Sequence, residues 1–149
     1  INKYINFDKY KKDIYYLWHF GHNANNLIDE NKMMNILENN KIIEKYDEKG
    51  WYGCFGVQTI ITLDFVKKLD KEYKIFKLIE FIDTRSKRMN FERVFSVLCT
   101  LINNNLYKEE SIYGEIHKYI EWEYSYDKYI EEESNKKQDY ELIKTWNGR

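Results

Sequence analysis

The segment SIYGEIHKY, residues 111–119, combines residue types that could do chemistry. Glu115 and His117 are two positions apart, so their side chains face the same way in an extended segment. A carboxylate and an imidazole on one face can coordinate a divalent ion or hold a phosphate. Gly114 allows close approach to the backbone. The alternative is a surface pair without a ligand.

Glu92 is a second candidate, because it lies near the start of the apolar segment FERVFSVLCTLI, residues 91–102. With Asn90 as the N-cap, Glu92 falls in the first turn of the predicted helix. There it complements the helix dipole, an effect worth about 0.3–1 kcal/mol, which is a structural explanation in itself. The functional alternative is a general base at the lip of a cleft, kept ionised by the dipole and by Arg88 and Arg93.

The stretch WYGCFG, residues 51–56, holds two of only 6 glycines in 149 residues. Ordered glycine costs roughly 0.5–1 kcal/mol relative to alanine, so Gly53 and Gly56 indicate that something comes close to the backbone. The sequence offers Cys54 no histidine at a spacing typical of cysteine enzymes. We therefore interpret Cys54 as a small buried residue rather than a nucleophile.

Positive charge collects just before the apolar segment, at Arg85, Lys87, Arg88 and Arg93, with Glu92 as the only acidic residue from 85 to 93. These basic residues either form a solvated helix face or bind an anion such as a diphosphate. His19 and His22, three positions apart, are a weak metal signal without a third ligand.

Composition limits the class of protein. The chain is 43% hydrophobic, 17% aromatic and 33% charged, which is typical of a folded domain, and its length suits a single domain. The excess of Ile, Asn, Lys and Tyr is also what an AT-rich genome encodes. A net charge of −1 argues against a nucleic-acid partner, and no apolar run is long enough to span a membrane. Two cysteines without a CxxC spacing favour the reducing cytoplasm.

Hydrophobic periodicity predicts a mixed α/β or α+β protein. Strands are expected at 13–20 and 54–61, and helices at 63–70, 71–82 and 91–102. Thr62 is the expected N-cap of the first helix, and the run NNN at 103–105 the stop of the last. Further expected elements are a short helix before Asn39, a brief strand and turn ending at Gly50, a strand at 120–126, a polar helix at 128–137 and a strand at 142–146.

Several blocks then occur in a recognisable order: WYGCFGVQTIITLDFV, TRSKRMNFERVFSVL, SIYGEIHKYIEW and IKTWNGR. Together they resemble the C-terminal half of nucleotide-sugar-dependent glycosyltransferases of the GT-A type found in giant viruses and some bacteria. The opening INKYINF and YLWHFGH are similar to the segment just past the midpoint of those proteins. The resemblance implies the acceptor-side part of a GT-A fold. A Rossmann-like nucleotide-binding segment with an Asp-x-Asp motif, which this sequence lacks, is expected upstream.

The resemblance also implies roles for individual residues. Glu92 would be the base that takes the proton from an acceptor hydroxyl, and His117 would be a metal or diphosphate ligand. The metal would be Mn²⁺, or else Mg²⁺. The donor would be a nucleoside-diphosphate sugar, and the acceptor a hydroxyl of a glycan, lipid-linked or protein molecule. The cleft would be lined by Trp51, Tyr52, Gly53, Cys54, Phe55 and Gly56, with Arg85 or Arg88 neutralising the departing diphosphate.

Two other functions stay open at this stage. One is a non-enzymatic carbohydrate- or protein-binding module that uses the aromatic strand with Trp122, Tyr124 and Tyr126. The other is a hydrolase that pairs Glu92 with Asp83 or Glu115, which would need a defined separation between the two carboxylates.

Overall fold

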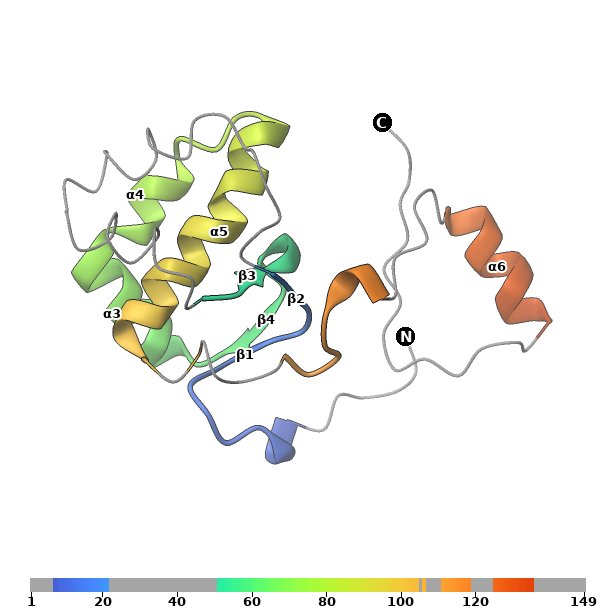
Figure 1. The fold of residues 1–149 in the computed structure, drawn as a ribbon, viewed down its shortest axis with the longest axis horizontal. Helices are drawn as coiled ribbons and strands as arrows, with labels where there is room; N and C mark the ends of the chain where they lie inside the picture. The colour runs from blue at the N-terminus through green and yellow to red at the C-terminus, as the bar shows by residue number, and fades with distance from the viewer. Residues whose placement is uncertain (1–6, 22–50, 105, 107–110, 119–124, 136–149) are drawn as a thin grey trace. The chain divides into compact units, whose positions relative to one another are not determined.

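The computed structural model describes residues 7–21, 51–104, 106, 111–118 and 125–135 (Figure 1). The chain divides into two compact units, Tyr10–Lys118 and the terminal segments Ile1–Lys9 with Tyr119–Arg149. The mixed class predicted from the sequence is confirmed, because short strands and helices occur together in the larger unit. The single domain expected from the chain length stays a prediction.

Four short strands form two antiparallel pairs. The strands are β1 (Ile14–Tyr16), β2 (His19–Phe20), β3 (Gly53–Cys54) and β4 (Thr59–Ile61). β1 pairs with β4, and β2 pairs with β3. The predicted strand 13–20 is therefore interrupted at residues 17–18. The predicted strand 54–61 is interrupted by the 3₁₀ turn η2 (Phe55–Val57).

The interruption has a simple cause in the register. Tyr16 pairs with Thr59, and His19 pairs with Cys54. Between these two pairs the segment with β1 and β2 advances by three residues, whereas the segment with β3 and β4 covers five. The two extra residues are taken up in a turn closed by the Gln58 N–H, which donates to the Phe55 carbonyl at 3.2 Å. Gly56 and Val57 both have positive φ, 61° and 55°. Positive φ at both central positions defines a type I′ turn, and it strains a β-branched residue such as valine.

A third segment, residues 112–115, runs beside β1 and β2. The Ile112 N–H donates to the Tyr16 carbonyl at 3.0 Å, and the His19 N–H donates to the Gly114 carbonyl at 3.1 Å. A parallel bridge joins His19 to Glu115. The arm containing His19 thus has hydrogen-bonded neighbours on both sides, and the segment that follows Ser111 is fixed against it.

Helix α3 (Leu63–Tyr73) begins as predicted. The Thr62 hydroxyl accepts a hydrogen bond from the Phe65 N–H at 3.3 Å, so the predicted N-cap is confirmed. The helix ends at Lys74, which is left-handed with φ 53°, and the short helix α4 (Ile75–Ile79) follows. The continuous helix predicted over 71–82 was wrong because the chain reverses handedness at Lys74.

Helix α5 (Arg85–Ile102) begins six residues earlier than the sequence predicted. Its N-cap is Thr84, whose hydroxyl accepts from the Lys87 N–H at 3.2 Å, and not Asn90, which is fully buried inside the helix. The first turn is polar, so hydrophobic periodicity does not detect it. The predicted stop is confirmed, because Asn103 is the C-cap.

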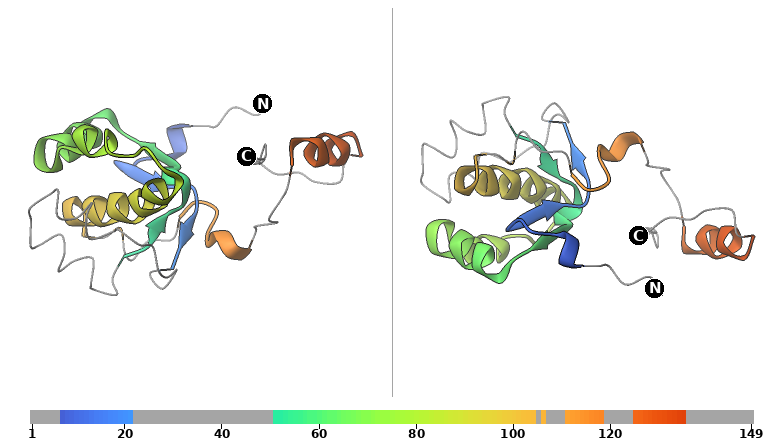
Figure 2. Two further views of the ribbon diagram at one scale, coloured as in Figure 1. Left: turned by 90° about the horizontal axis from the view of Figure 1, so that it is seen from above. Right: turned by 90° about the horizontal axis from the view of Figure 1, so that it is seen from below.

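The core of the larger unit lies between the strands and the helices α3, α4 and α5, which gather on one side of the strands (Figure 2). α5 contributes most to it, because its middle is buried on nearly every face. The buried residues of the core come from the strands as well as from the helices: Ile14, Tyr16, Trp51, Cys54, Phe65, Leu69, Ile75, Leu78, Phe91, Val94, Phe95, Val97, Leu98, Cys99 and Leu106.

The smaller unit is described by its helices, the 3₁₀ turn η1 (Phe7–Lys9) and α6 (Tyr126–Ser134). The polar helix predicted at 128–137 is confirmed over residues 128–134, and it begins two residues earlier. The elements predicted before Asn39 and Gly50 and at 142–146 lie outside the described residues, as do residues 120–124 of the strand predicted at 120–126. The end of that predicted strand was wrong, because Tyr126 begins α6. Among the helices that the structure describes, none is long and apolar enough to cross a membrane.

Replacement of Phe95 tests the core. Its ring lies 6.0 Å from the Phe91 ring and 6.5 Å from the Tyr16 ring, between centroids, and it is buried. We expect Phe95→Ala to lower the free energy of unfolding by about 3–5 kcal/mol, because a large buried ring is removed. Urea denaturation measures this change. The control is Leu63→Ala, 67% exposed, which should stay near neutral, and similar losses in both variants would contradict the core assignment.

Candidate functional site

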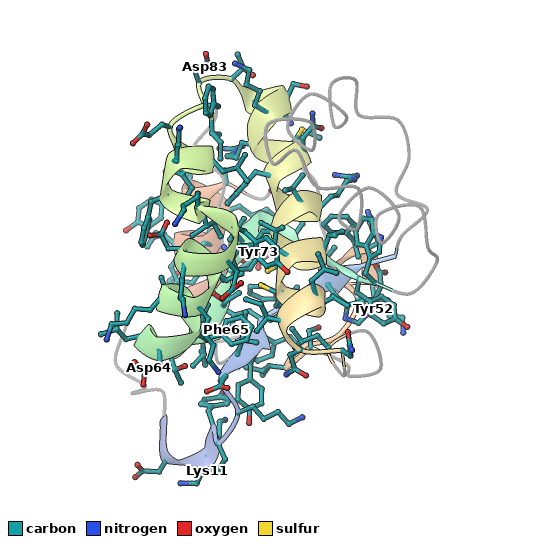
Figure 3. All side chains as sticks on the ribbon, turned by 90° about the vertical axis from the view of Figure 1, so that its left-hand side faces the viewer. Lys11, Tyr52, Asp64, Phe65, Tyr73 and Asp83 are labelled. Carbon is teal, nitrogen blue, oxygen red and sulfur yellow. The ribbon has the colours of Figure 1, made fainter. Side chains whose placement is uncertain are left out.

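Five side chains from three distant parts of the larger unit form what we call the polar cluster: His19, Tyr52, Ser111, Glu115 and His117. His19 lies on β2, Tyr52 directly precedes β3, and the other three lie on residues 111–117. Figure 3 shows Tyr52 on the α5 side of the helical layer. The cluster exists because β2 is hydrogen-bonded to β3 on one side and to the segment after Ser111 on the other.

His19 is held by Ser111. The His19 Nδ1 lies 2.7 Å from the Ser111 hydroxyl oxygen, although 92 residues separate them. The same oxygen accepts from the Gly114 N–H at 3.1 Å and donates to the Gly114 carbonyl at 2.9 Å. Because a hydroxyl has one proton, this arrangement is satisfied when Nδ1 carries the imidazole proton and donates it to Ser111. Ser111 therefore sets both the orientation and the tautomer of His19.

Tyr52 supplies an aromatic face at the same place. Its ring centroid lies 4.8 Å from that of His19, with the planes inclined at 54°, and 38% of the residue is exposed. Trp51, which the sequence suggested as a second stacking surface, is buried in the core. Tyr52 is thus the exposed aromatic residue of the WYGCFG stretch, beside polar groups on its neighbouring strand.

Glu115 and His117 are in contact, as the spacing predicted. The His117 Nδ1 lies 2.6 Å from the Glu115 carboxylate. The segment is not extended there, because the 3₁₀ turn η4 (Ile116–Lys118) carries His117 and folds it back. Burial raises the pKa of Glu115, but the hydrogen bonds from the His117 side chain and backbone, with the charges of His117 and His19, hold it below its ordinary value. The carboxylate is therefore stabilised in its ionised form.

The glycine that raised the question of close approach has a protein neighbour. A Cβ atom built on Gly53 would lie 2.0–2.5 Å from three atoms of the Phe20 ring, on the paired strand. The same ring contacts the buried Arg93, whose guanidinium carbon lies 4.8 Å from the ring centroid. Close approach at Gly53 is thus accounted for by Phe20, and Gly56 serves the type I′ turn.

Cys54 is a buried structural residue, as interpreted from the sequence. Its N–H donates to the Ser96 hydroxyl at 2.7 Å, and both Cys54 and Cys99 are buried free thiols. Burial raises the pKa of the Cys54 thiol well above its ordinary value, and the charges of Cys99 and Glu92 raise it further. The thiolate that a nucleophile needs is therefore disfavoured.

Glu92 does not lie where the sequence placed it. α5 starts at Arg85, so Glu92 lies two turns inside the helix and beyond the reach of the N-terminal dipole. The first turn instead holds Arg85, Ser86 and Lys87. Glu92 is half-buried, and its carbonyl accepts from the Ser96 hydroxyl at 3.0 Å. The dipole argument for an ionised base at this position was therefore wrong.

Arg85 and Arg88 lie apart from the polar cluster. Both are exposed in the first turn of α5, and the contact of α5 with β3 is at Ser96. From Ser96 they are about 16 Å and 12 Å distant along the helix axis, at 1.5 Å per residue. Asp83, a candidate hydrolase acid, is paired with Lys87 at 2.7 Å, and that hydrogen bond lowers the pKa of Asp83. A general acid needs the opposite shift.

Sequence reasoning found Glu115, His117 and Tyr52 but missed Ser111 as a partner of His19. The sequence SIYG indicates only the local turn that the Ser111 side chain closes with Gly114, and not the pairing of Ser111 with His19. His22, the other half of the suggested metal pair, lies outside the described residues. Within the described part of the chain, no three His, Cys, Asp or Glu side chains are grouped so that they could hold a metal ion.

Comparisons with known proteins add no relative. No protein-family model, curated protein or solved structure matches the chain.

A pair of glycine variants tests the contact between β2 and β3. In Gly53→Ala the new methyl group would overlap the Phe20 ring, and we expect a loss of about 1–3 kcal/mol of unfolding free energy. Gly21→Ala is the matched control, because no described atom lies within 4 Å of a Cβ there. Thermal or urea unfolding measures both. Equal stability of the two variants would contradict the close packing of Phe20 on Gly53.

The Glu115–His117 contact is tested by titration. His117→Ala removes the side-chain hydrogen bond and the charge of His117, two of the causes that lower the pKa of Glu115, so this pKa should rise. In the wild type, the stabilisation is complete above the ordinary pKa of glutamate and is lost as the pH falls through the lowered value. Carboxyl ¹³C NMR measures the pKa directly. Lys118→Ala, at the exposed neighbouring position, should leave it unchanged, and an unaltered Glu115 pKa in His117→Ala would refute the contact.

Proposed function

We propose that this chain is the acceptor-side part of a GT-A type glycosyltransferase, and that the polar cluster binds the sugar and diphosphate of a nucleotide-sugar donor. The single observation that supports the proposal is the exposed Tyr52 ring beside His19, close to the ionised Glu115 carboxylate. His117 is hydrogen-bonded to that carboxylate. Sugars are bound by aromatic faces that cover their C–H groups and by charged or polar groups that bond their hydroxyls. The reaction class rests on the resemblance of the order of sequence blocks to that of GT-A enzymes.

In this proposal each member of the cluster has a role that its chemistry fits. The Tyr52 ring stacks on the sugar, and the Glu115 carboxylate accepts hydrogen bonds from sugar hydroxyls. His117 donates to, or binds beside, the diphosphate. Ser111 acts through His19, whose ring it holds against Tyr52. Ser111 is thus a positioning residue.

A divalent ion, Mn²⁺ or Mg²⁺, belongs to the proposal as well. The Glu115 carboxylate and the His117 imidazole are donor types that Mn²⁺ accepts, and the ion would replace the proton that they now share in their 2.6 Å hydrogen bond. Two ligands do not complete a coordination sphere, so the donor diphosphate and the upstream nucleotide-binding segment would supply the others. The ion would supply positive charge against the departing diphosphate.

Glu92 stays the predicted base of the transfer, supported by the sequence resemblance alone. Arg85 and Arg88 stay predicted diphosphate partners on the same basis. They lie about 16 Å and 12 Å along α5 from its contact with β3, farther than one diphosphate spans, so this prediction and the binding of the diphosphate by His117 are alternatives. The reducing cytoplasm stays the predicted location, on the basis of two cysteines without a CxxC spacing in the sequence.

The test is calorimetric titration with UDP-glucose and GDP-mannose, with and without Mn²⁺, repeated with any upstream coding sequence attached. We expect binding that depends on Mn²⁺ and that weakens about tenfold or more in Tyr52→Ala and in Glu115→Gln. Tyr126→Ala is the matched control, because Tyr126 is an exposed tyrosine of the other compact unit. Glu92→Gln should bind the donor normally and lose transfer.

Two outcomes would overturn the proposal. If neither donor binds in either form of the chain, the glycosyltransferase assignment fails and the non-enzymatic binding module takes its place. If donors bind but Tyr52→Ala and Tyr126→Ala behave alike, the polar cluster is not the donor site.

A further inference from the structure

Helix α4 carries apolar side chains both toward the core and toward solvent. Ile75 and Leu78 point into the core and are almost completely buried. Phe76 and Ile79 of the same helix are 56% and 43% exposed, and Phe81, two residues beyond the helix, is 42% exposed. We call these three residues the α4 outer face. Three large exposed apolar side chains occur here within six residues, unlike the single exposed apolar residues that any surface carries.

Basic residues surround the α4 outer face in the sequence. Lys74 and Lys77 flank it directly and are exposed, and Arg85, Lys87 and Arg88 follow in the first turn of α5. Residues 74–88 hold these five basic side chains and two acidic ones, Glu80 and Asp83, for a net charge of +3 in a chain whose total is −1. The Asp83 carboxylate lies 2.7 Å from the Lys87 ammonium, so Asp83 offsets the charge of Lys87 and not that of Lys74 or Lys77.

From this combination we propose that the α4 outer face docks on an anionic phospholipid bilayer. A partly exposed apolar face can insert at the boundary of headgroups and acyl chains, and flanking Lys and Arg side chains are attracted to acidic lipid headgroups. The bilayer provides both complements at once. The insertion would be shallow, since it involves one short helix and the residue two positions beyond it.

The charges also argue against a second copy of this chain as the occupant. A symmetric contact through the α4 outer face would bring Lys74 and Lys77 of one molecule near the same residues of its partner. Like charges across an interface oppose association. An anionic surface has the opposite effect, so charge complementarity favours the bilayer.

The test is co-sedimentation of the chain with vesicles of phosphatidylcholine alone and of phosphatidylcholine mixed with phosphatidylglycerol. We expect binding to the mixed vesicles, release at high salt, and little binding to phosphatidylcholine alone. Phe76→Asp and, separately, Phe81→Asp should each weaken binding to mixed vesicles by about tenfold or more. Lys74→Gln combined with Lys77→Gln should weaken it and reduce its salt dependence.

Leu63→Asp is the matched control, because Leu63 is also an exposed apolar residue, at the start of α3. Figure 3 shows Asp64, its neighbour, and Asp83, which follows α4, at opposite ends of the helical layer. Leu63→Asp should bind mixed vesicles like the wild type. Near-ultraviolet circular dichroism checks that each variant is folded, which is expected because the replaced side chains are exposed.

Several results would overturn the proposal. Absence of binding to mixed vesicles, or equal weakening by Leu63→Asp and Phe76→Asp, would exclude the α4 outer face as a lipid surface. Dimerisation that Phe76→Asp abolishes, without vesicle binding, would assign the face to a second copy instead. None of these measurements uses a nucleotide sugar, so the lipid surface and the proposed glycosyl transfer stand or fall separately.

Discussion

The larger unit depends on the contact between α5 and β3. There the buried Ser96 hydroxyl accepts the Cys54 N–H at 2.7 Å and donates to the Glu92 carbonyl at 3.0 Å. A backbone N–H in a dry core costs about 1–3 kcal/mol if it has no partner, so this serine fixes where the helix can lie on the strand. Ser96 and Cys54 are 42 residues apart, so this hydrogen bond holds together two parts of the core that are distant in the sequence.

The polar cluster follows from this constraint. Once β3 is held by α5, the Phe20 ring packs against Gly53, and Arg93 of the same helix lies over that ring. β2 is therefore fixed, and His19 is next to Phe20 on that strand. The position of His19 beside Tyr52 is in this sense decided inside the core. Buried packing of a few side chains thus sets the geometry of the buried His19 and of the exposed Tyr52 beside it.

The parts of the fold that could be predicted from the sequence are the local ones. Thr62 as a cap, the apolar face of α5 with Phe91, Phe95 and Leu98, and the stop at Asn103 all follow from spacing and side-chain chemistry. The start of α5 and the interruption of both strands could not be predicted in this way. A polar first turn has no hydrophobic period, and the two-residue insertion at Gly56 and Val57 is defined only relative to the partner strand.

The same distinction separates what was found in the candidate site from what was not. Glu115 and His117 are two residues apart, so their contact is local and the sequence indicates it. The pair of His19 and Ser111 depends on the parallel alignment of residues 112–115 with β2, which no local pattern encodes. Glu92 was misplaced for a related reason, since its environment depends on where α5 begins. A site assembled from three distant segments becomes visible only when the long-range pairing of its strands is known, because each segment alone has an ordinary structural explanation.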